Sequence, residues 1–252
     1  FVHPNRGRVR RIFDQASFLP TALLTALRTP RPDVVLATSP TLFAACTACA
    51  TGLLRRVPFV LEIGDLAAAS IDAVGALRIR PALSLVQRVE RFLYRKAARI
   101  VVQTERVRDE VVAVSGRSAS AIAVITNGVE ASLFRSVAER YTPPAGAPFV
   151  AGYVGTMGLA QGLEVILDAA DRLRDCPVDF HLVGDGAARP ALEAGATGRR
   201  LTNVRFSGPY PRPQMPDVWA SIHLALVCLR DHPTFRNVVP SKIFEAMACG
   251  VP

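Results

Sequence analysis

Short apolar runs alternate with stretches of helical periodicity along the whole chain of 252 residues. In the first half, the pattern predicts strands at residues 33–37, 58–63, 99–103 and 121–125, with helices at 13–27, 42–54, 83–97 and 106–114. The strands are nearly continuous hydrophobic runs, which is typical of parallel strands buried on both faces. The pattern therefore predicts an α/β fold in which helices cover a parallel sheet.

A proline-rich segment at residues 136–148 interrupts this pattern, after which the alternation begins again. The second half predicts strands at residues 149–154, 178–183, 204–206 and 223–229, separated by helices at 163–173, 188–194 and 213–221. We therefore expect two Rossmann-like domains, at residues 1–142 and 149–252. Phe1 lies inside an already patterned sequence and Pro252 stops where another strand is due, so we expect a fragment in which both domains are truncated.

The last thirteen residues, 240–252, carry the strongest local signals. Pro240 opens a predicted short helix, Gly250 follows its end and Pro252 stops it. Helical spacing predicts a buried face of Ile243, Phe244 and Met247 and a second face of Ser241, Glu245 and Ala248. The helix thus combines one carboxylate, one cation (Lys242) and N-terminal N–H groups that suit a phosphate.

Half of the residues are apolar and one-fifth are charged, as in an ordinary globular protein. The net charge is +9, and arginine carries nearly all of the positive charge because Lys96 and Lys242 are the only lysines. The basic residues cluster at 6–11 and 78–99. No zinc-ligand spacing, RNA-recognition signature or aromatic-basic interleaving accompanies them, so we expect no nucleic-acid partner. An anionic lipid surface and an ordinary solvated face are the alternatives that fit.

The five cysteines are an odd number and lie in apolar surroundings. Cys46 and Cys49 have the spacing of a redox or metal motif, but no second pair or nearby histidine completes a site. We therefore expect buried, reduced thiols in a cytoplasmic protein, and no bound metal. The stretch 42–54 is too short and too rich in threonine to span a bilayer.

Three loops after predicted strands of the second half are candidates for ligand binding, because ligands bind beyond the carboxyl ends of the strands in such folds. Their candidate ligand-binding residues are Gly155, Gly158, Gln161, Gly162, Gly184, Asp185, Gly186, Asn237, Pro240, Ser241, Lys242 and Glu245. Glycines allow the backbone to approach a ligand closely. The spacing differs from the dinucleotide-binding pattern, which argues against a nicotinamide cofactor.

These motifs, taken together and in order, resemble glycosyltransferase family 4. The likeness lies in residues 31–35, 61–66, 90–97, 125–129, 155–162, 182–186, 204–208 and 240–252. It covers nearly the whole chain and is nearest to bacterial amino-sugar transferases of surface-polysaccharide assembly. The resemblance implies the GT-B architecture, with two Rossmann-like domains that contain parallel sheets. It also implies that the N-terminal domain faces the acceptor and the C-terminal domain binds the nucleotide sugar.

The resemblance implies transfer of a hexosyl or N-acetylaminosugar group from a nucleoside diphosphate sugar to a saccharide acceptor, expected to be lipid-linked. The configuration would be retained, with no cofactor and no obligatory metal. The leaving diphosphate gains charge, so cations and N–H donors aimed at it lower the barrier. Lys242 and the Ser241 end of the helix are suited to this role, and Glu245 matches the family glutamate that binds the ribose. We expect a cytoplasmic protein that lies on the inner face of a membrane through its basic N-terminal domain.

The chain also departs from the family pattern. Asn237 replaces the first glutamate of the family's pair, and residues 156–161 lack the arginine and lysine that many members use to hold the diphosphate. Asp65 follows a predicted strand and is a candidate base or orienter for the acceptor hydroxyl. A turn-forming aspartate is the alternative. The candidate catalytic residues are therefore Asp65, Lys242 and Glu245.

Two other functions fit the same scaffold. A sugar-nucleotide epimerase would act without any acceptor. A non-catalytic module that binds a nucleotide or a lipid surface would bind without turnover, and Asn237 makes this alternative reasonable.

Overall fold

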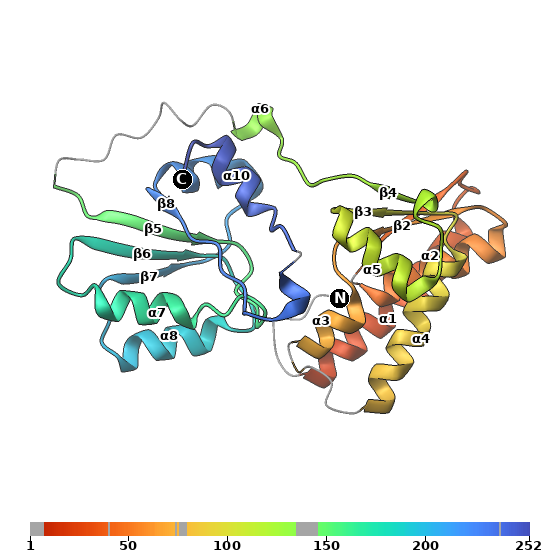
Figure 1. Ribbon diagram of the computed structural model, residues 1–252, viewed down its shortest axis with the longest axis horizontal. Helices are drawn as coiled ribbons and strands as arrows, with labels where there is room; N and C mark the ends of the chain where they lie inside the picture. Colours follow the sequence, from red (N-terminus) through yellow and green to blue (C-terminus); the bar gives the residue numbers. More distant parts are fainter. Residues whose placement is uncertain (1–7, 40, 74, 76–79, 135–145, 237) are drawn as a thin grey trace. The chain divides into compact units, whose positions relative to one another are not determined.

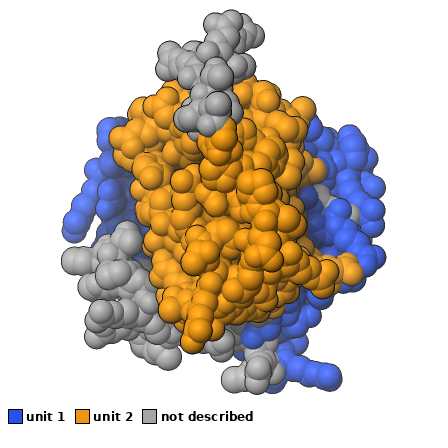
Figure 2. Space-filling model, turned by 90° about the vertical axis from the view of Figure 1, so that its left-hand side faces the viewer, with its two compact units in different colours: residues 1–126, 232–238 blue, residues 127–231, 239–252 orange. Residues whose placement is uncertain are grey.

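The structure is a computed structural model, and it describes residues 8–39, 41–73, 75, 80–134, 146–236 and 238–252. The chain divides into two compact units (Figure 2). Unit 1 comprises residues 1–126 and 232–238, and unit 2 comprises residues 127–231 and 239–252. The predicted proline-rich boundary at 136–148 falls largely outside the described residues.

Unit 1 contains a parallel four-stranded sheet with the strand order β1-β2-β3-β4 (Figure 1). Its strands are β1 (Val35–Ser39), β2 (Phe59–Ile63), β3 (Arg99–Val102) and β4 (Ile122–Val124). Its helices are α1 (Arg8–Arg28), α2 (Leu42–Arg55), α3 (Ala67–Ala73), α4 (Arg80–Lys96) and α5 (Glu105–Ser115), with a 3-10 turn at Ala119–Ala121. Leu61, Ile63, Ile100 and Val102 are fully buried in its core. These four side chains point to the same face of the sheet, which is the buried face. Val60, Glu62 and Val101 on the other face are only half-buried, so the prediction that these strands are buried on both faces is wrong for this sheet.

Unit 2 contains a second parallel sheet with the order β7-β6-β5-β8 (Figure 1). Its strands are β5 (Phe149–Val154), β6 (Val178–Val183), β7 (Val204–Ser207) and β8 (Leu224–Ala225). Its helices are α6 (Ala131–Phe134), α7 (Glu164–Arg172), α8 (Arg189–Gly198), α9 (Met215–Ala220) and α10 (Lys242–Ala248), with a 3-10 turn at Arg212–Gln214. A 3-10 turn at Pro233–Phe235 belongs to unit 1.

Two hydrophobic clusters cover the two faces of the second sheet. Tyr153 and Leu182 pack with apolar residues of α7 and α8, whereas Val154 and Val183 pack with α9 and α10. Neighbouring residues of a strand point to opposite faces, so each strand contributes to both clusters. Because helices cover both faces of this sheet, a ligand can reach the strands only at their ends, and ligands of such folds bind at the loops that follow the carboxyl ends.

The predicted fold class, α/β with two parallel sheets, is confirmed. The strands predicted at 149–154 and 178–183 have the observed bounds. The strand predicted at 223–229 is wrong in length, because pairing with β5 is confined to Leu224 and Ala225. The short helices α3 and α6 were not predicted.

Two predictions of burial are also wrong. Met247 is 70% exposed, and α10 instead buries Ala246 against the cluster that contains Trp219. The small alanine side chain faces the partner elements, whereas helical spacing alone does not identify which face has a partner. The five cysteines are free thiols, as expected, but Cys176 is exposed.

Candidate active site

Two glycine turns meet at the carboxyl ends of β5 and β6. The N–H of Gly155 donates to the carbonyl of Val183 at 2.9 Å, and the N–H of Met157 donates to the carbonyl of Asp185 at 2.8 Å. A Cβ atom on Gly184 would overlap the carbonyl oxygen of Gly155. Gly155 and Gly184 also have φ values of +129° and +135°, which disfavour any side chain. The two loops are therefore packed backbone against backbone, and only glycine fits at the contact.

The Lys242 side chain reaches these turns from the first residue of α10. Its Nζ atom would lie 3.1 Å from a Cβ atom on Gly155, so the missing side chain gives the ammonium its room. The Nζ atom also lies 3.6 Å from the centroid of the Tyr153 ring. Burial lowers the pKa of Lys242 to about 8, while the charges of Cys228 and Glu245 act in the opposite direction. The structure thus brings the predicted cation to the predicted glycine loop.

Glu245 lies one turn farther along α10 and is held by other side chains. The indole Nε1 of Trp219 donates to Glu245 Oε2 at 3.2 Å. Arg212 approaches the second oxygen, Oε1, at 4.0 Å. Trp219 is fully buried, so its side chain is a fixed anchor for the carboxylate.

The remaining predicted donor residues mainly shape the loops. The side chain of Asp185 accepts the N–H of Gly186 at 2.7 Å, so this carboxylate stabilises the turn. A Cβ atom on Gly158 would lie 2.7 Å from Gln161 Oε1, and Gly162 has a φ of +61°. Ser241 precedes α10 without a side-chain capping bond. The N–H of Ile243 donates to the carbonyl oxygen of Pro240 at 3.1 Å. Asn237 lies outside the described residues.

Asp65 lies in unit 1, two residues after the end of β2. Burial raises the pKa of its carboxyl group above the usual value. The helix that follows is α3, and its first N–H group, from Ala67, donates to Glu90 Oε1 at 2.8 Å. The hydroxyl of Tyr94 donates to the same oxygen at 2.7 Å. Glu90 is 3% exposed, so a buried carboxylate from α4 fixes the segment that follows Asp65.

Sequence reasoning did not single out Glu90 or Tyr153. Glu90 belongs to one of the motifs that carry the family resemblance, but its spacing to Asp65 is not local. Tyr153 is the one aromatic hydroxyl in the apolar run of β5, and this is the signal that marks it in the sequence.

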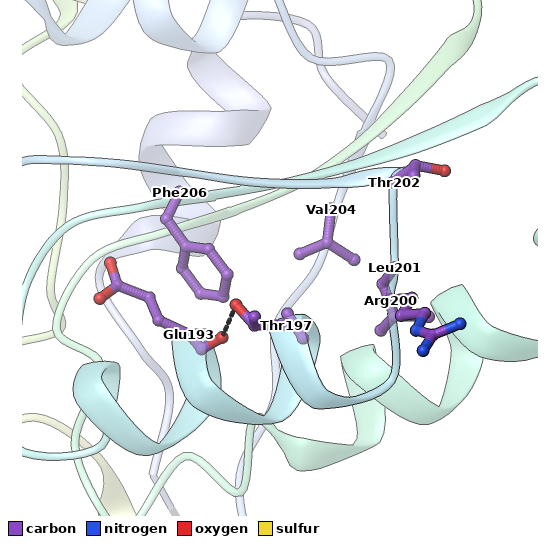
Figure 3. Close-up of a pocket in the computed structure, with 8 residues that line it drawn as sticks. Glu193, Thr197, Arg200, Leu201, Thr202, Val204 and Phe206 are labelled. Carbon is purple, nitrogen blue, oxygen red and sulfur yellow. Dashed lines mark hydrogen bonds between the residues drawn. The ribbon is translucent and has the colours of Figure 1, made fainter.

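The described cavities lie elsewhere. One, of about 390 Å³, lies between α8 and the edge strand β7, and Figure 3 shows Phe206 and Val204 on one side and Glu193 and Thr197 on the other. Another, of about 650 Å³, lies in unit 1 along α1, α2 and β1. Neither is lined by a predicted site residue.

Two further searches covered the part of the chain that the structure describes. Within these residues, no cluster of three histidine, cysteine, aspartate or glutamate side chains is arranged to hold a metal ion. Among the described helices, none combines the length and the apolar character that crossing a membrane requires.

Two protein-family models match the chain in sequence order. Residues 2–128 match a glycosyl transferase 4-like domain, and residues 148–252 match the glycosyl transferases group 1 model. The two matches correspond broadly to the two halves that carry separate sheets.

Individual relatives are more distant. The Escherichia coli (strain K12) protein WcaI, which is assigned to colanic acid biosynthesis, is 27% identical, with 94% of this chain and 60% of that protein covered. A 2-deoxystreptamine glucosyltransferase of Streptomyces kanamyceticus is 30% identical, with 67% and 45% covered. The chain thus spans about half to three-fifths of the length of these relatives.

Solved structures share the fold. The Anabaena protein HepE in complex with UDP and glucose superposes with a TM-score of 0.71 at 20% identity, covering 95% of this chain and 62% of that chain. The sucrose-phosphate synthase of Thermosynechococcus elongatus superposes with a TM-score of 0.73 at 19% identity, covering 95% and 60%. These similarities show the GT-B fold of two Rossmann-like domains.

Proposed function

We propose, because the chain belongs to the glycosyl transferase 4-like family, that it moves a sugar from a nucleoside diphosphate sugar to an acceptor hydroxyl. The observation that carries this proposal is the Lys242 ammonium, which lies against Gly155 where two glycine turns end β5 and β6. A cation beside glycine turns at the carboxyl ends of parallel strands suits a diphosphate. The complexes of HepE with UDP and with UDP-glucose support the same class of donor.

In the proposed reaction, the bond between the anomeric carbon and the diphosphate oxygen breaks, and a bond from that carbon to the acceptor oxygen forms. The diphosphate gains negative charge, and Lys242 stabilises it. Glu245, anchored by Trp219, binds the ribose hydroxyls. Asp65 orients the acceptor hydroxyl or takes its proton, and burial raises the pKa of its carboxyl group, which makes the carboxylate a stronger base. We propose that configuration is retained and that no metal or other cofactor is required.

We further propose a hexosyl or N-acetylaminosugar donor and a lipid-linked saccharide acceptor, in bacterial surface-polysaccharide assembly. A 2-deoxystreptamine N-acetyl-D-glucosaminyltransferase of Streptomyces fradiae, which is 27% identical to this chain, supports an N-acetylaminosugar donor. The colanic acid protein of Escherichia coli supports a role in polysaccharide assembly. The protein would then act in the cytoplasm, on the inner face of the membrane.

Binding of UDP, GDP and dTDP, measured by calorimetry, tests the donor site. We expect Lys242→Ala to lower the affinity for the diphosphate that binds most tightly by about tenfold to a hundredfold, which is the usual effect of losing a charged hydrogen bond. The matched control is Lys96→Ala, which removes the only other lysine and leaves affinity unchanged. Unchanged affinity in Lys242→Ala would show that the donor does not bind at α10.

Turnover separates transfer from the alternative functions. We expect consumption of the nucleotide sugar to require an added saccharide acceptor. Conversion of the donor to its epimer without an acceptor would favour the epimerase, and binding without any turnover would favour the non-catalytic module.

Helix α4 supports the proposed membrane contact. Its exposed side chains include two large apolar ones, Leu85 (61%) and Phe92 (48%), together with Arg88 and Arg91. The single acidic residue of α4, Glu90, is buried, so the exposed face of this helix carries no negative charge. Apolar side chains flanked by arginine are typical of a surface that binds anionic lipid.

Sedimentation with phosphatidylcholine vesicles, with and without phosphatidylglycerol, tests this contact. We expect salt-sensitive binding to the anionic vesicles, weakened about tenfold or more by the double change Arg88→Glu and Arg91→Glu. The same change at Arg172 and Arg205, two exposed arginines of unit 2, is the control. Equal losses in both variants would indicate nonspecific attraction by net charge and would contradict a role for α4.

A further inference from the structure

We propose that Tyr153 is a positioning residue that holds both the Lys242 ammonium and the first glycine loop in place for a diphosphate. This inference rests on the proposed donor site and adds a residue to it. Tyr153 is the fifth residue of β5, two positions before Gly155. Its side chain is fully buried, so neighbouring groups fix the position of the ring.

The ring of Tyr153 forms a cation–π contact with Lys242. The Nζ atom lies 3.6 Å from the ring centroid, well within the range of about 6 Å over which an aromatic face attracts a cation. The face of a ring attracts the ammonium without using a full negative charge. The positive charge therefore stays available to a diphosphate, whereas a carboxylate at the same place would neutralise it.

The hydroxyl of Tyr153 reaches the loop itself. It donates a hydrogen bond to the carbonyl oxygen of Thr156 at 2.6 Å. Thr156 lies between Gly155, which contacts Lys242, and Met157, which bonds to Asp185. One side chain thus connects the cation to the backbone that is expected to surround the diphosphate.

Lys242 needs such support because its surroundings favour the neutral amine. Burial lowers its pKa to about 8, and the opposing charges come from Cys228 and Glu245. Glu245 is already engaged by Trp219 and Arg212, and burial raises the pKa of Cys228, which disfavours the thiolate. The attraction of the Tyr153 ring therefore favours the protonated form of Lys242 near neutral pH.

Replacement of Tyr153 by phenylalanine analogues with increasing fluorination tests the cation–π contact. Fluorine weakens the negative face of the ring while nearly preserving its size. We expect Tyr153→Phe, which keeps the ring but loses the hydroxyl bond to Thr156, to bind UDP, GDP or dTDP about threefold more weakly than the wild type. The trifluorinated analogue should bind about tenfold more weakly than Tyr153→Phe. The pH above which affinity falls should move lower along the same series. Equal affinities across the series would overturn the proposal.

A double-mutant cycle with Lys242→Gln separates positioning from mere packing. We expect fluorination to have no further effect on binding once the ammonium is absent, because the two changes remove the same contact. Equal fluorination effects in both backgrounds would overturn the proposal and assign Tyr153 a packing role. Tyr210, which is 41% exposed in unit 2, provides the control position for the same analogues.

The same measurements distinguish this inference from the proposed function. Weaker binding by Lys242→Gln, together with no effect of fluorination at position 153 in the protein that keeps Lys242, leaves the donor site in place and contradicts only the role of Tyr153. No binding of any of the three diphosphates by the wild type contradicts both.

Discussion

The two units hold their candidate residues by different means. In unit 2, the loops after β5 and β6 pack through main-chain atoms, and glycines at 155 and 184 make the contact possible. In unit 1, the segment after Asp65 is fixed by a buried side chain, because Glu90 accepts the first N–H group of α3. The proposed donor side thus depends on residues that must lack a side chain. The proposed acceptor side depends on a carboxylate that must be present.

This difference suits the two proposed ligands. A diphosphate is common to many donors, and backbone N–H groups recognise it without regard to the sugar attached. Acceptors are diverse, and a segment held by side chains changes more readily by substitution. We therefore expect substitutions to act through backbone strain in unit 2 and through lost hydrogen bonds in unit 1.

The largest effect is expected for Gly184→Ala. Its Cβ atom would overlap the carbonyl of Gly155, and its φ of +135° is strained for alanine. We expect the free energy of unfolding of unit 2 to fall by about 4 kcal/mol and donor binding to be lost. Urea unfolding followed by Trp219 fluorescence and calorimetry with UDP, GDP and dTDP measure both. Gly208→Ala is the control, because a Cβ atom there meets nothing within 4 Å. A Gly184→Ala variant with normal stability and normal donor binding would show that unit 2 does not depend on the absence of a side chain at this position.

Next in size is Glu90→Ala. The change leaves the N–H of Ala67 and the hydroxyl of Tyr94 without the acceptor that now serves both. We expect the free energy of unfolding of unit 1 to fall by about 3 kcal/mol, as measured by chemical denaturation. Glu90→Gln keeps an acceptor oxygen and should recover most of the loss. If Glu90→Gln were as unstable as Glu90→Ala, the charge rather than the hydrogen bonds would be responsible.

The pH dependence of donor binding is expected to be smaller. The ammonium of Lys242 is present below its pKa of about 8 and is lost above it. Diphosphate affinity should therefore be nearly constant up to about pH 8 and then fall by up to about tenfold per pH unit. Titration calorimetry at a series of pH values checks this. Lys242→Arg, which stays charged, should abolish the fall in affinity above pH 8. If the fall persisted in Lys242→Arg, another titrating group would be responsible.

The smallest effect is expected for Arg212→Ala. Arg212 is 59% exposed, and it lies 4.0 Å from Glu245 and 3.8 Å from Glu130. Exposed pairs of this kind contribute less than about 0.5 kcal/mol, so stability should hardly change. If thermal unfolding showed a loss of stability as large as that expected for Glu90→Ala, side-chain contacts would also dominate in unit 2. The contrast between the units would then be much weaker.

Much of the fold can be predicted from local pattern. The apolar run of β5 is continuous, that of β6 is interrupted by Asp179 and His181, and both strands end at a glycine, so their bounds coincide with the predicted ones. The pattern fails where structure depends on distant partners. Helix α3 has no strong signal of its own, because Glu90 from another helix satisfies its N-terminus. The burial of Ala246 rather than Met247 likewise depends on where α10 meets the cluster around Trp219.

The candidate site is predictable to a similar degree. Glycine spacing identifies the loops, and the scarcity of lysine makes Lys242 conspicuous. What spacing cannot provide is the proximity of Tyr153 to Lys242, or of Trp219 to Glu245, since each pair joins elements far apart in the chain. Those contacts follow from the packing of α10 against α9 and against the end of β5, where Ala246, Trp219 and Val154 belong to one cluster.

The lowered pKa of Lys242 also makes this side chain a selective chemical reporter. At neutral pH about one in ten Lys242 side chains is the free amine, compared with about one in several thousand for a lysine of ordinary pKa. The chain has a single competing lysine, Lys96. Mild acylation with an amine-specific reagent should therefore mark Lys242 before Lys96, while the α-amino group, whose usual pKa is also about 8, is followed on its own peptide. Mass spectrometry of the tryptic peptides, with and without UDP, GDP or dTDP, would then show occupancy as protection of one amine, even before an acceptor is known.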